Sequence, residues 1–149
     1  MASFGFKMSE ELQEELSEHL SKIDEVAPKM LEEAAPILVK ALKHHAPTSI
    51  KKASNTVRAS KLKNNIKAKK PKKTKNGAWI LPIVFTGKEI RKTSDGKYYD
   101  VTNAQKAAYA EYGKSDQEAS PFIRPAIEDC EDDVNIEMQA VFFREMMKK

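Results

Sequence analysis

The residues that could support catalysis or metal binding are three histidines, one cysteine and several clustered carboxylates. His44 and His45 are adjacent, so on a helix their side chains point about 100° apart and do not share a metal ion. His19 is distant in sequence. We interpret the adjacent pair as solvated histidines at a helix end, where the helix dipole favours positive charge. The carboxylates within 128–133 form a run on a predicted helix, which is typical of a solvated face.

No combination of residues in the sequence indicates an enzyme, a cofactor or a metal site, because phosphate-loop, zinc-protease and serine-hydrolase motifs are missing. Cys130 falls on the apolar face of a predicted helix, which indicates a packed, inert thiol. Glu111 is the most notable carboxylate, because alanines and tyrosines flank it. It is expected to pair either with a Lys or Arg side chain or with backbone N–H groups that follow Gly113, and both roles are structural.

The net charge of +4 hides an uneven distribution. Residues 1–50 carry 5 Lys and 9 acidic residues, and residues 76–149 carry 10 basic and 13 acidic residues. Residues 51–75 carry 11 basic residues and no acid. The chain is therefore mildly acidic with one basic segment. It has no apolar run long enough for a membrane span and no signal-peptide pattern, so we expect a protein of the reducing cytoplasm with no membrane contact.

The basic segment allows three interpretations. It is a solvated hairpin, it contacts an acidic surface of a neighbouring subunit or partner, or it lines a channel through which DNA passes. The absence of aromatic residues from 50–75 argues against recognition of single strands by base stacking. The candidate residues for contact with DNA or a partner are Lys63, Lys67, Lys69, Lys70, Lys72 and Lys73.

Helical periodicity dominates the N-terminal third. Leucines and other apolar residues recur at steps of three or four after Ser9, a plausible N-cap. Because proline interrupts helices, we predict one helix from about Ser9 to Val26 and a second from about Pro28 to His44. The second is bent near Pro36. A single long kinked helix is equally compatible. Residues 1–8 are expected to form a flexible leader.

The middle of the chain is predicted to be β-structure. Alternation from Leu62 to Lys69 predicts a strand with a packed face and a lysine-rich face, followed by a hairpin or loop that ends at Gly77. Trp79–Phe85 is the richest strand pattern, and Pro82 within it indicates an edge strand or a bulge. The turn at 93–96 should lead into a short strand at 97–101. Residues 51–77 thus form a basic strand and loop within a single domain, 1–149.

Two further helices are expected. Asn103 is a candidate cap for a helix over 104–112, with an extended conformation as the alternative. The last helix is predicted from Pro121 to Lys149, with Ile127, Cys130, Val134, Met138, Val141 and Phe142 on its apolar face. Helices segregated from a small antiparallel sheet define an α+β fold, in which the sheet packs against the long N-terminal helix and the C-terminal helix.

One stretch, 107–126, combines a helix stop at Gly113, a polar loop and a proline-led helix start with Phe122 as an anchor. Its order E-Y-G, spacer, P-F-I-R-P-A resembles the signature of the HK ninety-seven gene-product-ten family of phage tail-completion proteins. In that family the blocks usually read Glu-aromatic-Gly-Thr and Pro-Phe-Leu-x-Pro-Ala. The candidate residues for the family motif and for an interface with other phage proteins are Glu111, Tyr112, Gly113, Pro121, Phe122, Arg124 and Pro125. Ala126 also matches the motif. Lys114 and Ile123 depart from the usual Thr and Leu.

The resemblance implies a virion structural protein of a tailed bacteriophage or prophage, located in the virion neck and assembled in the host bacterial cytoplasm. Its implied partners are the head connector and the tail terminator or tail tube, with self-association into a ring that is often six-fold. Non-specific contact with genome DNA is a further implication. The alternative hypothesis, from the basic segment alone, is a small cytoplasmic protein that binds double-stranded DNA.

Overall fold

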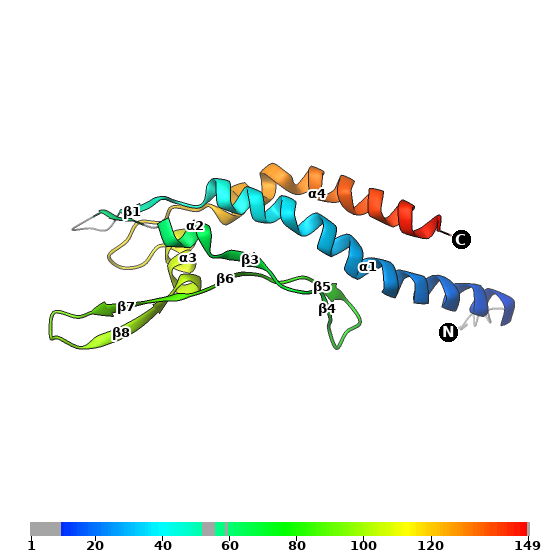
Figure 1. The fold of residues 1–149 in the computed structure, drawn as a ribbon, viewed down its shortest axis with the longest axis horizontal. Coiled ribbons are helices and arrows are strands. Elements are labelled where there is room, and N and C mark those ends of the chain that lie inside the picture. Colours follow the sequence, from blue (N-terminus) through cyan, green and yellow to red (C-terminus); the bar gives the residue numbers. More distant parts are fainter. Residues whose placement is uncertain (1–9, 52–55, 59, 149) are drawn as a thin grey trace, which may run out of the picture.

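The computed structural model describes residues 10–51, 56–58 and 60–148, and the predicted leader 1–8 lies outside them. The fold is α+β, as predicted. Two long helices lie side by side, and short antiparallel strand pairs with two smaller helices lie along one side of them (Figure 1). The helices are α1 (Glu10–His45), α2 (Ser60–Asn64), α3 (Asn103–Tyr112) and α4 (Ile123–Met146).

The N-terminal third forms one helix, so the prediction of two helices is wrong and the single-helix alternative is correct. Both Pro28 and Pro36 lie inside α1. Each proline removes one backbone hydrogen bond, but packing of α1 along α4 stabilises the helix on both sides of the two sites. Val26, Ala34 and Leu42 are buried on this long helix. Tertiary packing therefore outweighs the local cost of the prolines.

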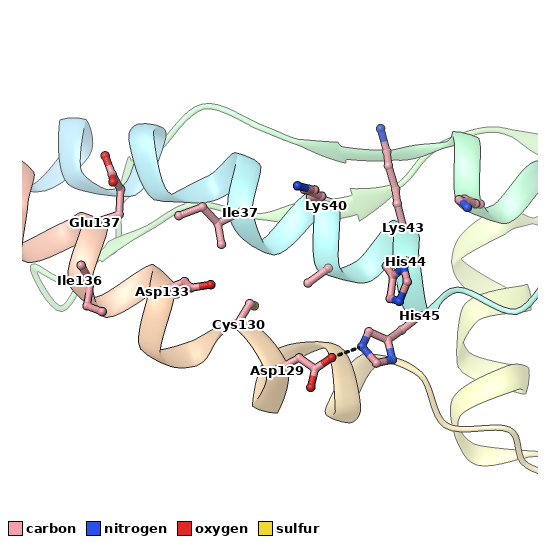
Figure 2. Close-up of a pocket in the computed structure, with 12 residues that line it drawn as sticks. Ile37, Lys40, Lys43, His44, His45, Asp129, Cys130, Asp133, Ile136 and Glu137 are labelled. Carbon is pink, nitrogen blue, oxygen red and sulfur yellow. Dashed lines mark hydrogen bonds and ion pairs between the residues drawn. The ribbon is translucent and has the colours of Figure 1, made fainter.

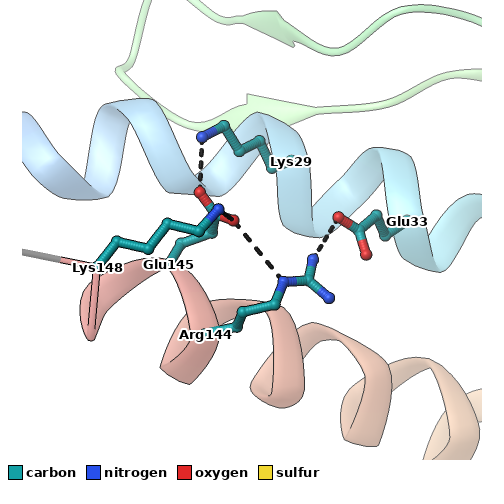
Figure 3. A network of polar contacts seen from close by, with 5 residues as sticks. All are labelled: Lys29, Glu33, Arg144, Glu145 and Lys148. Atoms are coloured by element: carbon teal, nitrogen blue, oxygen red, sulfur yellow. Dashed lines mark hydrogen bonds and ion pairs between the residues drawn. The ribbon is translucent and has the colours of Figure 1, made fainter.

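The far end of α4 is fixed to α1 by an ion-pair network (Figure 3). Glu145 accepts hydrogen bonds from Lys29 at 2.7 Å and from Lys148 at 2.5 Å, while Arg144 pairs with Glu33 at 2.5 Å. The Glu145 side chain is only 7% exposed. The bonds of Lys29 and Glu33 connect α4 to the middle of α1 and fix the relative position of the two helices along their length, whereas the Lys148 bond is local to the end of α4.

Helix α4 begins two residues later than predicted and buries a slightly different face. Cys130 and Val141 are buried as expected, but Ile127 is 45% exposed and Ala126 is buried in its place. The apolar face of α4 therefore starts at Ala126, next to the motif residue Phe122.

The strands form four separate two-stranded antiparallel pairs. These pairs are β1 (Ser49–Lys51) with β2 (Thr56–Arg58), β3 (Ile66–Ala68) with β6 (Ile83–Phe85), β4 (Lys72–Lys73) with β5 (Trp79–Ile80), and β7 (Lys88–Lys92) with β8 (Tyr98–Thr102). Pro82 separates β5 from β6, and its carbonyl accepts a hydrogen bond from the backbone N–H of Lys69 at 2.8 Å. The hairpin turns at Gly77 and Gly96 have positive φ and lie where the sequence predicts turns.

The predicted strand at Leu62–Lys69 is only partly correct. Leu62 is buried but lies in α2, while Ile66 is buried at the start of β3 and Ala68 is exposed. Leu62 and Ile66 are four residues apart, a spacing that fits both a helix and an alternating strand. The periodicity alone therefore does not separate a helical turn followed by a strand from one longer strand.

The segment predicted to be either helical or extended is helical, and forms α3. Its N-cap residue is Thr102, so the prediction of Asn103 as the cap is wrong. The Thr102 hydroxyl accepts a hydrogen bond from the backbone N–H of Gln105, and the Gln105 side-chain oxygen accepts one from the backbone N–H of Thr102 at 3.0 Å. The buried Asn103 instead donates its side-chain N–H to the Thr86 carbonyl at 2.6 Å, joining α3 to the end of β6. The main core lies where α1, α2, β3, α3 and the start of α4 meet, and consists of Leu42, Ala46, Leu62, Ile66, Ala107, Ala110, Phe122 and Ala126.

Candidate functional site

The carboxylate of Glu111, near the end of α3, caps the first turn of α4. It accepts hydrogen bonds from the backbone N–H groups of Phe122 at 2.8 Å, Ile123 at 2.9 Å and Arg124 at 3.4 Å. The sequence predicts that Glu111 pairs either with a Lys or Arg side chain or with backbone N–H groups after Gly113. The structure shows the pairing with backbone N–H groups. A helix N-terminus presents unsatisfied donors and partial positive charge, and a carboxylate from another element satisfies both.

The prolines complete this arrangement. Phe122 is the N-cap residue and makes no side-chain cap hydrogen bond. Pro125 stands in the first turn of α4 and has no N–H to satisfy, and the Ala126 N–H already donates to the Phe122 carbonyl at 3.2 Å. The regular helical hydrogen bonds of α4 begin at the Ala126 N–H. Glu111 therefore accepts hydrogen bonds from all three backbone N–H groups that come before it at the helix start, those of Phe122, Ile123 and Arg124. This explains why the motif contains Glu in one block and Pro in the other.

Gly113 allows the loop between the helices to fold back on α3. Its φ of 73° and ψ of 179° lie in a region that is essentially restricted to glycine. A Cβ at this position would lie 3.0 Å from both the Ala119 nitrogen and the Gln117 carbonyl oxygen. Ser120 then donates its N–H to the Ala110 carbonyl at 2.7 Å, and the buried Gln117 side chain donates to the Tyr109 carbonyl at 3.0 Å. The loop is thus a folded unit.

Phe122 is the anchor of the junction. It is 2% exposed and packs edge-to-face on Phe85 of β6, with ring centroids 5.9 Å apart. Small residues of α3, Ala107 and Ala110, are buried in the same core and leave room for the ring. The residues Glu111, Gly113, Phe122 and Pro125 therefore meet in one structural junction between α3 and α4.

Three motif positions lie outside this junction core. Tyr112 is 83% exposed, and the Arg124 side chain is also exposed, with its guanidinium 3.5 Å from the Glu128 carboxylate one helical turn later. Pro121 is exposed at the helix start. The sequence pattern does not distinguish these exposed positions from the buried ones, because the motif mixes both.

The six candidate lysines do not form one patch. All are exposed, but Lys63 lines a groove between α1 and α4, whereas Lys69 and Lys70 line a second groove on the other side of α1. Lys73 pairs with Asp24 of α1 at 2.5 Å, and Asp24 also accepts from the Trp79 indole at 3.0 Å. This pairing attaches the β4–β5 hairpin to α1. The pKa of Asp24 is lowered by its hydrogen bonds with Lys73 and Trp79.

The second groove, here called the α1–β3 groove, has a volume of about 400 Å³. Most of its lining is apolar and comes from α1, from β3 and from the segment between β5 and β6. Glu32 is its only acid. The full lining is Glu32, Ala35, Pro36, Val39, Ala68, Lys69, Lys70 and Leu81.

The larger groove, here called the α1–α4 groove, has a volume of about 780 Å³ and lies between the C-terminal end of α1 and the first half of α4 (Figure 2). His45 at its edge bonds Asp129 at 2.6 Å, so the interpretation of both histidines as merely solvated is wrong for His45. Burial raises the pKa of the Cys130 thiol, and the charges of Asp129 and Asp133 raise it further. Such a thiol is a poor nucleophile. The sequence gives no signal for the His45–Asp129 pair, because 84 positions separate its members.

The described residues contain no group of three or more His, Cys, Asp or Glu side chains arranged to hold a metal ion. Among the helices of residues 10–148, none is long and apolar enough to cross a membrane. The arrangement offers instead a rigid junction, two grooves and several exposed apolar side chains.

Comparison with known proteins identifies the family. No curated protein and no solved structure matches the chain significantly. The model of a family described as "Bacteriophage HK97-gp10, putative tail-component" matches residues 7–113, which is more than two thirds of the chain. The match ends at Gly113, so it includes the E-Y-G block, and the hydrogen bonds of Glu111 connect that block to the P-F-I-R-P-A block beyond it. The chain belongs to the HK97-gp10-like family of phage tail components.

Proposed function

We propose that this chain is a tail-completion protein that joins the head connector of a tailed phage or prophage to the tail, as one subunit of a ring in the virion neck. The observation that carries the proposal is membership of a phage tail-component family together with the two-block junction built around Glu111. A protein in this position works by binding. It closes the joint between two preassembled parts and leaves a lumen for the genome, and it assembles in the host cytoplasm.

Exposed apolar side chains on projecting elements support an assembly role. The β7–β8 hairpin extends away from the helices (Figure 1), and on it Ile90 is 65% and Tyr98 is 70% exposed. An isolated two-stranded hairpin is marginally stable in water. Exposed aromatic and aliphatic residues on such an element are typical of a surface that becomes covered on assembly. Candidate covering partners are a neighbouring subunit, the head connector and the tail tube or tail terminator.

The lysines have a separate place in the proposal. The basic residues of β3 and β4 would give part of the ring a positive surface that meets either genome DNA or an acidic partner. Replacement of Lys69, Lys70 and Lys72 by Ser should leave folding intact, because these three side chains are exposed and Lys73, which attaches the β4–β5 hairpin to α1, is kept. It should reduce genome passage or neck assembly. Normal phage production by this variant would remove these lysines from the mechanism.

The test of the neck function uses the phage or induced prophage that carries the gene. Without the gene, electron microscopy should show filled heads and separate tails, and supplying the chain in trans should restore joined particles. Antibody labelling of restored particles should then mark the neck. Normally joined particles without the gene, or labelling along the whole tail, would contradict the proposal.

The alternative function, a double-stranded DNA-binding protein, rests on the +11 charge of residues 51–75. It predicts that the isolated monomer binds a short duplex tightly at low salt and releases it steeply as salt rises. Size-exclusion chromatography with light scattering, with and without the duplex, separates the two functions. A chain that ignores the duplex, as a monomer or as a salt-tolerant oligomer, favours the neck.

A further inference from the structure

The outer face of α4 carries an apolar stripe that no described part of the chain covers. Ile136 is 63%, Phe143 is 61% and Met147 is 80% exposed, and Ala140 is exposed between them. Steps of four, three and four residues place these positions within about 60° of one another on a helix. The buried Val141 lies about 130° from the centre of the stripe. The stripe is therefore separate from the face of α4 that packs on α1, and in Figure 1 this helix has α1 and the strands on one side only.

The stripe has the spacing of a coiled-coil seam, in which apolar residues alternate at steps of three and four. Across a pair of antiparallel copies, Phe143 of each copy would face Ala140 of the other, and Ile136 would face Met147. A parallel pair would instead set each residue against its own copy, which crowds the Phe143 rings and leaves a gap at Ala140. It would also place the five acids within 128–133 of both copies side by side. Shape and charge therefore favour the antiparallel pair.

Charged residues along one flank of the stripe fit the same antiparallel pair. The acids Asp133 and Glu137 come first, and the basic residues Arg144 and Lys148 follow. Helical geometry places all four on the flank nearer α1, about 60–120° from Ile136. The charges are centred between positions 140 and 141, and the apolar stripe is centred between 141 and 142. An antiparallel pair therefore sets Asp133 of one copy opposite Lys148 of the other, and Glu137 opposite Arg144.

These contacts are compatible with the ion pairs inside each chain. Arg144 bonds Glu33 of α1, and Lys148 bonds Glu145. The guanidinium group has five N–H donors and the ammonium group has three, so each has donors left for a second carboxylate. Exposed ion pairs contribute little affinity, but opposite charges at these positions select the direction in which two copies of α4 pair.

We propose that two copies of the free protein associate through an antiparallel, two-fold contact between their α4 stripes. The stripe is only about 17 Å long, so the contact is smaller than a standard interface and reversible, with a dissociation constant on the order of 0.1 mM. A two-fold contact closes with two copies and does not propagate. It is therefore distinct from the ring contact of the proposed neck, does not rest on that function, and covers the apolar face of α4 before assembly.

Sedimentation equilibrium of the full chain, from roughly 5 µM to 1 mM, measures the association. The average mass should rise from that of one chain towards that of two. Phe143→Glu should lower the association constant by about tenfold or more, because it places a charge in the seam. Ile90→Glu, at a 65% exposed position of the β7–β8 hairpin, is the matched control and should leave association unchanged. At a few micromolar the chain should be monomeric, so changes at Phe143 act on association only at higher concentration.

Charge reversal on the flank gives an independent readout. Asp133→Lys with Glu137→Lys should weaken association by about tenfold, because it brings like charges together along the seam. Glu128→Lys with Glu131→Lys makes the same change in net charge on the same helix. These two positions lie beyond the end of the partner helix in the antiparallel pair, so this control should associate like the original chain. Circular dichroism should show that each variant is folded.

Directed disulfide formation tests the antiparallel direction. The background is Cys130→Ala, which removes the single cysteine, and Ile136→Cys and Met147→Cys proteins are oxidised alone and mixed. Positions 136 and 147 of different copies should lie within the roughly 7 Å between Cα atoms that a disulfide needs. Identical positions lie about 17 Å apart along the seam. The mixture should therefore give about tenfold more 136–147 product than either protein gives of its own dimer.

Three results would overturn this contact. A chain that stays monomeric up to the highest concentration leaves the outer face of α4 to a different protein, such as another neck component. Equal weakening by Phe143→Glu and Ile90→Glu would mean that association does not depend on the stripe. Equal yields of mixed and self disulfides would exclude the antiparallel register. None of these results bears on the neck function, which joined particles test, and failure of the neck function would leave the association of the free chain measurable.

Discussion

The carboxylate of Glu111 accepts a 2.8 Å hydrogen bond from the backbone N–H of Phe122, eleven residues later in the chain. A residue at the end of one helix thus caps the next helix, and the polar loop between them is closed by the same bond. The two blocks of the family motif are therefore one structural unit. The cap fixes where α4 starts, and the packing of α4 on α1 follows from that starting point.

Replacing Glu111 by Gln should destabilise the fold by about 1–2 kcal/mol. The amide keeps the shape but loses the charge that favours a helix N-terminus, and charged hydrogen bonds contribute more than neutral ones. Chemical denaturation followed by circular dichroism measures the change. Glu118→Gln, an exposed carboxylate in the same loop, is the matched control and should have little effect. Equal stability of both variants and the original chain would show that the charge of the Glu111 cap contributes nothing.

Replacing Gly113 by Ala should cost more stability than the same change at Gly77. Both residues have positive φ, 73° and 82°, so both substitutions strain the backbone by about 1–2 kcal/mol. A Cβ at Gly77 meets nothing within 4 Å, whereas one at Gly113 lies 3.0 Å from two backbone atoms of the loop. The difference in unfolding free energy between the two variants should be at least about 1 kcal/mol. Equal losses would mean that the loop moves freely away from α3.

The sequence predicts features whose cause is local. The turn glycines Gly77 and Gly96 have the positive φ that their positions require, and the bonding of Glu111 to backbone N–H groups was one of two predicted alternatives. These features depend on residues that are near one another in the chain or on conformations that only glycine adopts at low cost.

Other features depend on packing between distant segments and were not predictable. Pro28 and Pro36 favour a break by local rules, yet α1 continues because α4 packs along it. The pairing of Asp129 with His45 joins two helices that the sequence does not place together. In each case the deciding interaction comes from a residue dozens of positions away, which local periodicity does not report.

Replacing Phe122 by Ala should destabilise the fold by about 3–5 kcal/mol, because the ring is 2% exposed and its loss leaves a cavity beside Phe85. Phe143→Ala is the control, since that ring is 61% exposed on α4. It should change the melting temperature of the isolated chain only slightly. Similar melting temperatures for both variants would show that Phe122 does not anchor the junction.

Acid should weaken the attachment of α4 to α1 through Glu145. Hydrogen bonds from Lys148 and Lys29 lower the pKa of Glu145 from 4.5 to about 2. A carboxyl group with a lowered folded-state pKa contributes stability that is fully present above its unfolded pKa and is lost as the pH falls towards the folded value. Stability should therefore fall between pH 4.5 and pH 2, and Glu145→Gln should flatten that part of the curve.

The control for this pH dependence is Glu131→Gln, an exposed carboxylate on the same helix, which should leave the curve unchanged. Asp24, whose pKa is also lowered, should keep part of the acid sensitivity in every variant. The measurement is the unfolding free energy from urea denaturation at several pH values. If Glu145→Gln and the original chain lose stability in parallel down to pH 2, the network in Figure 3 does not hold the two helices together. If the curves diverge below pH 4.5, the end of α4 is fixed to α1 by charge as well as by packing.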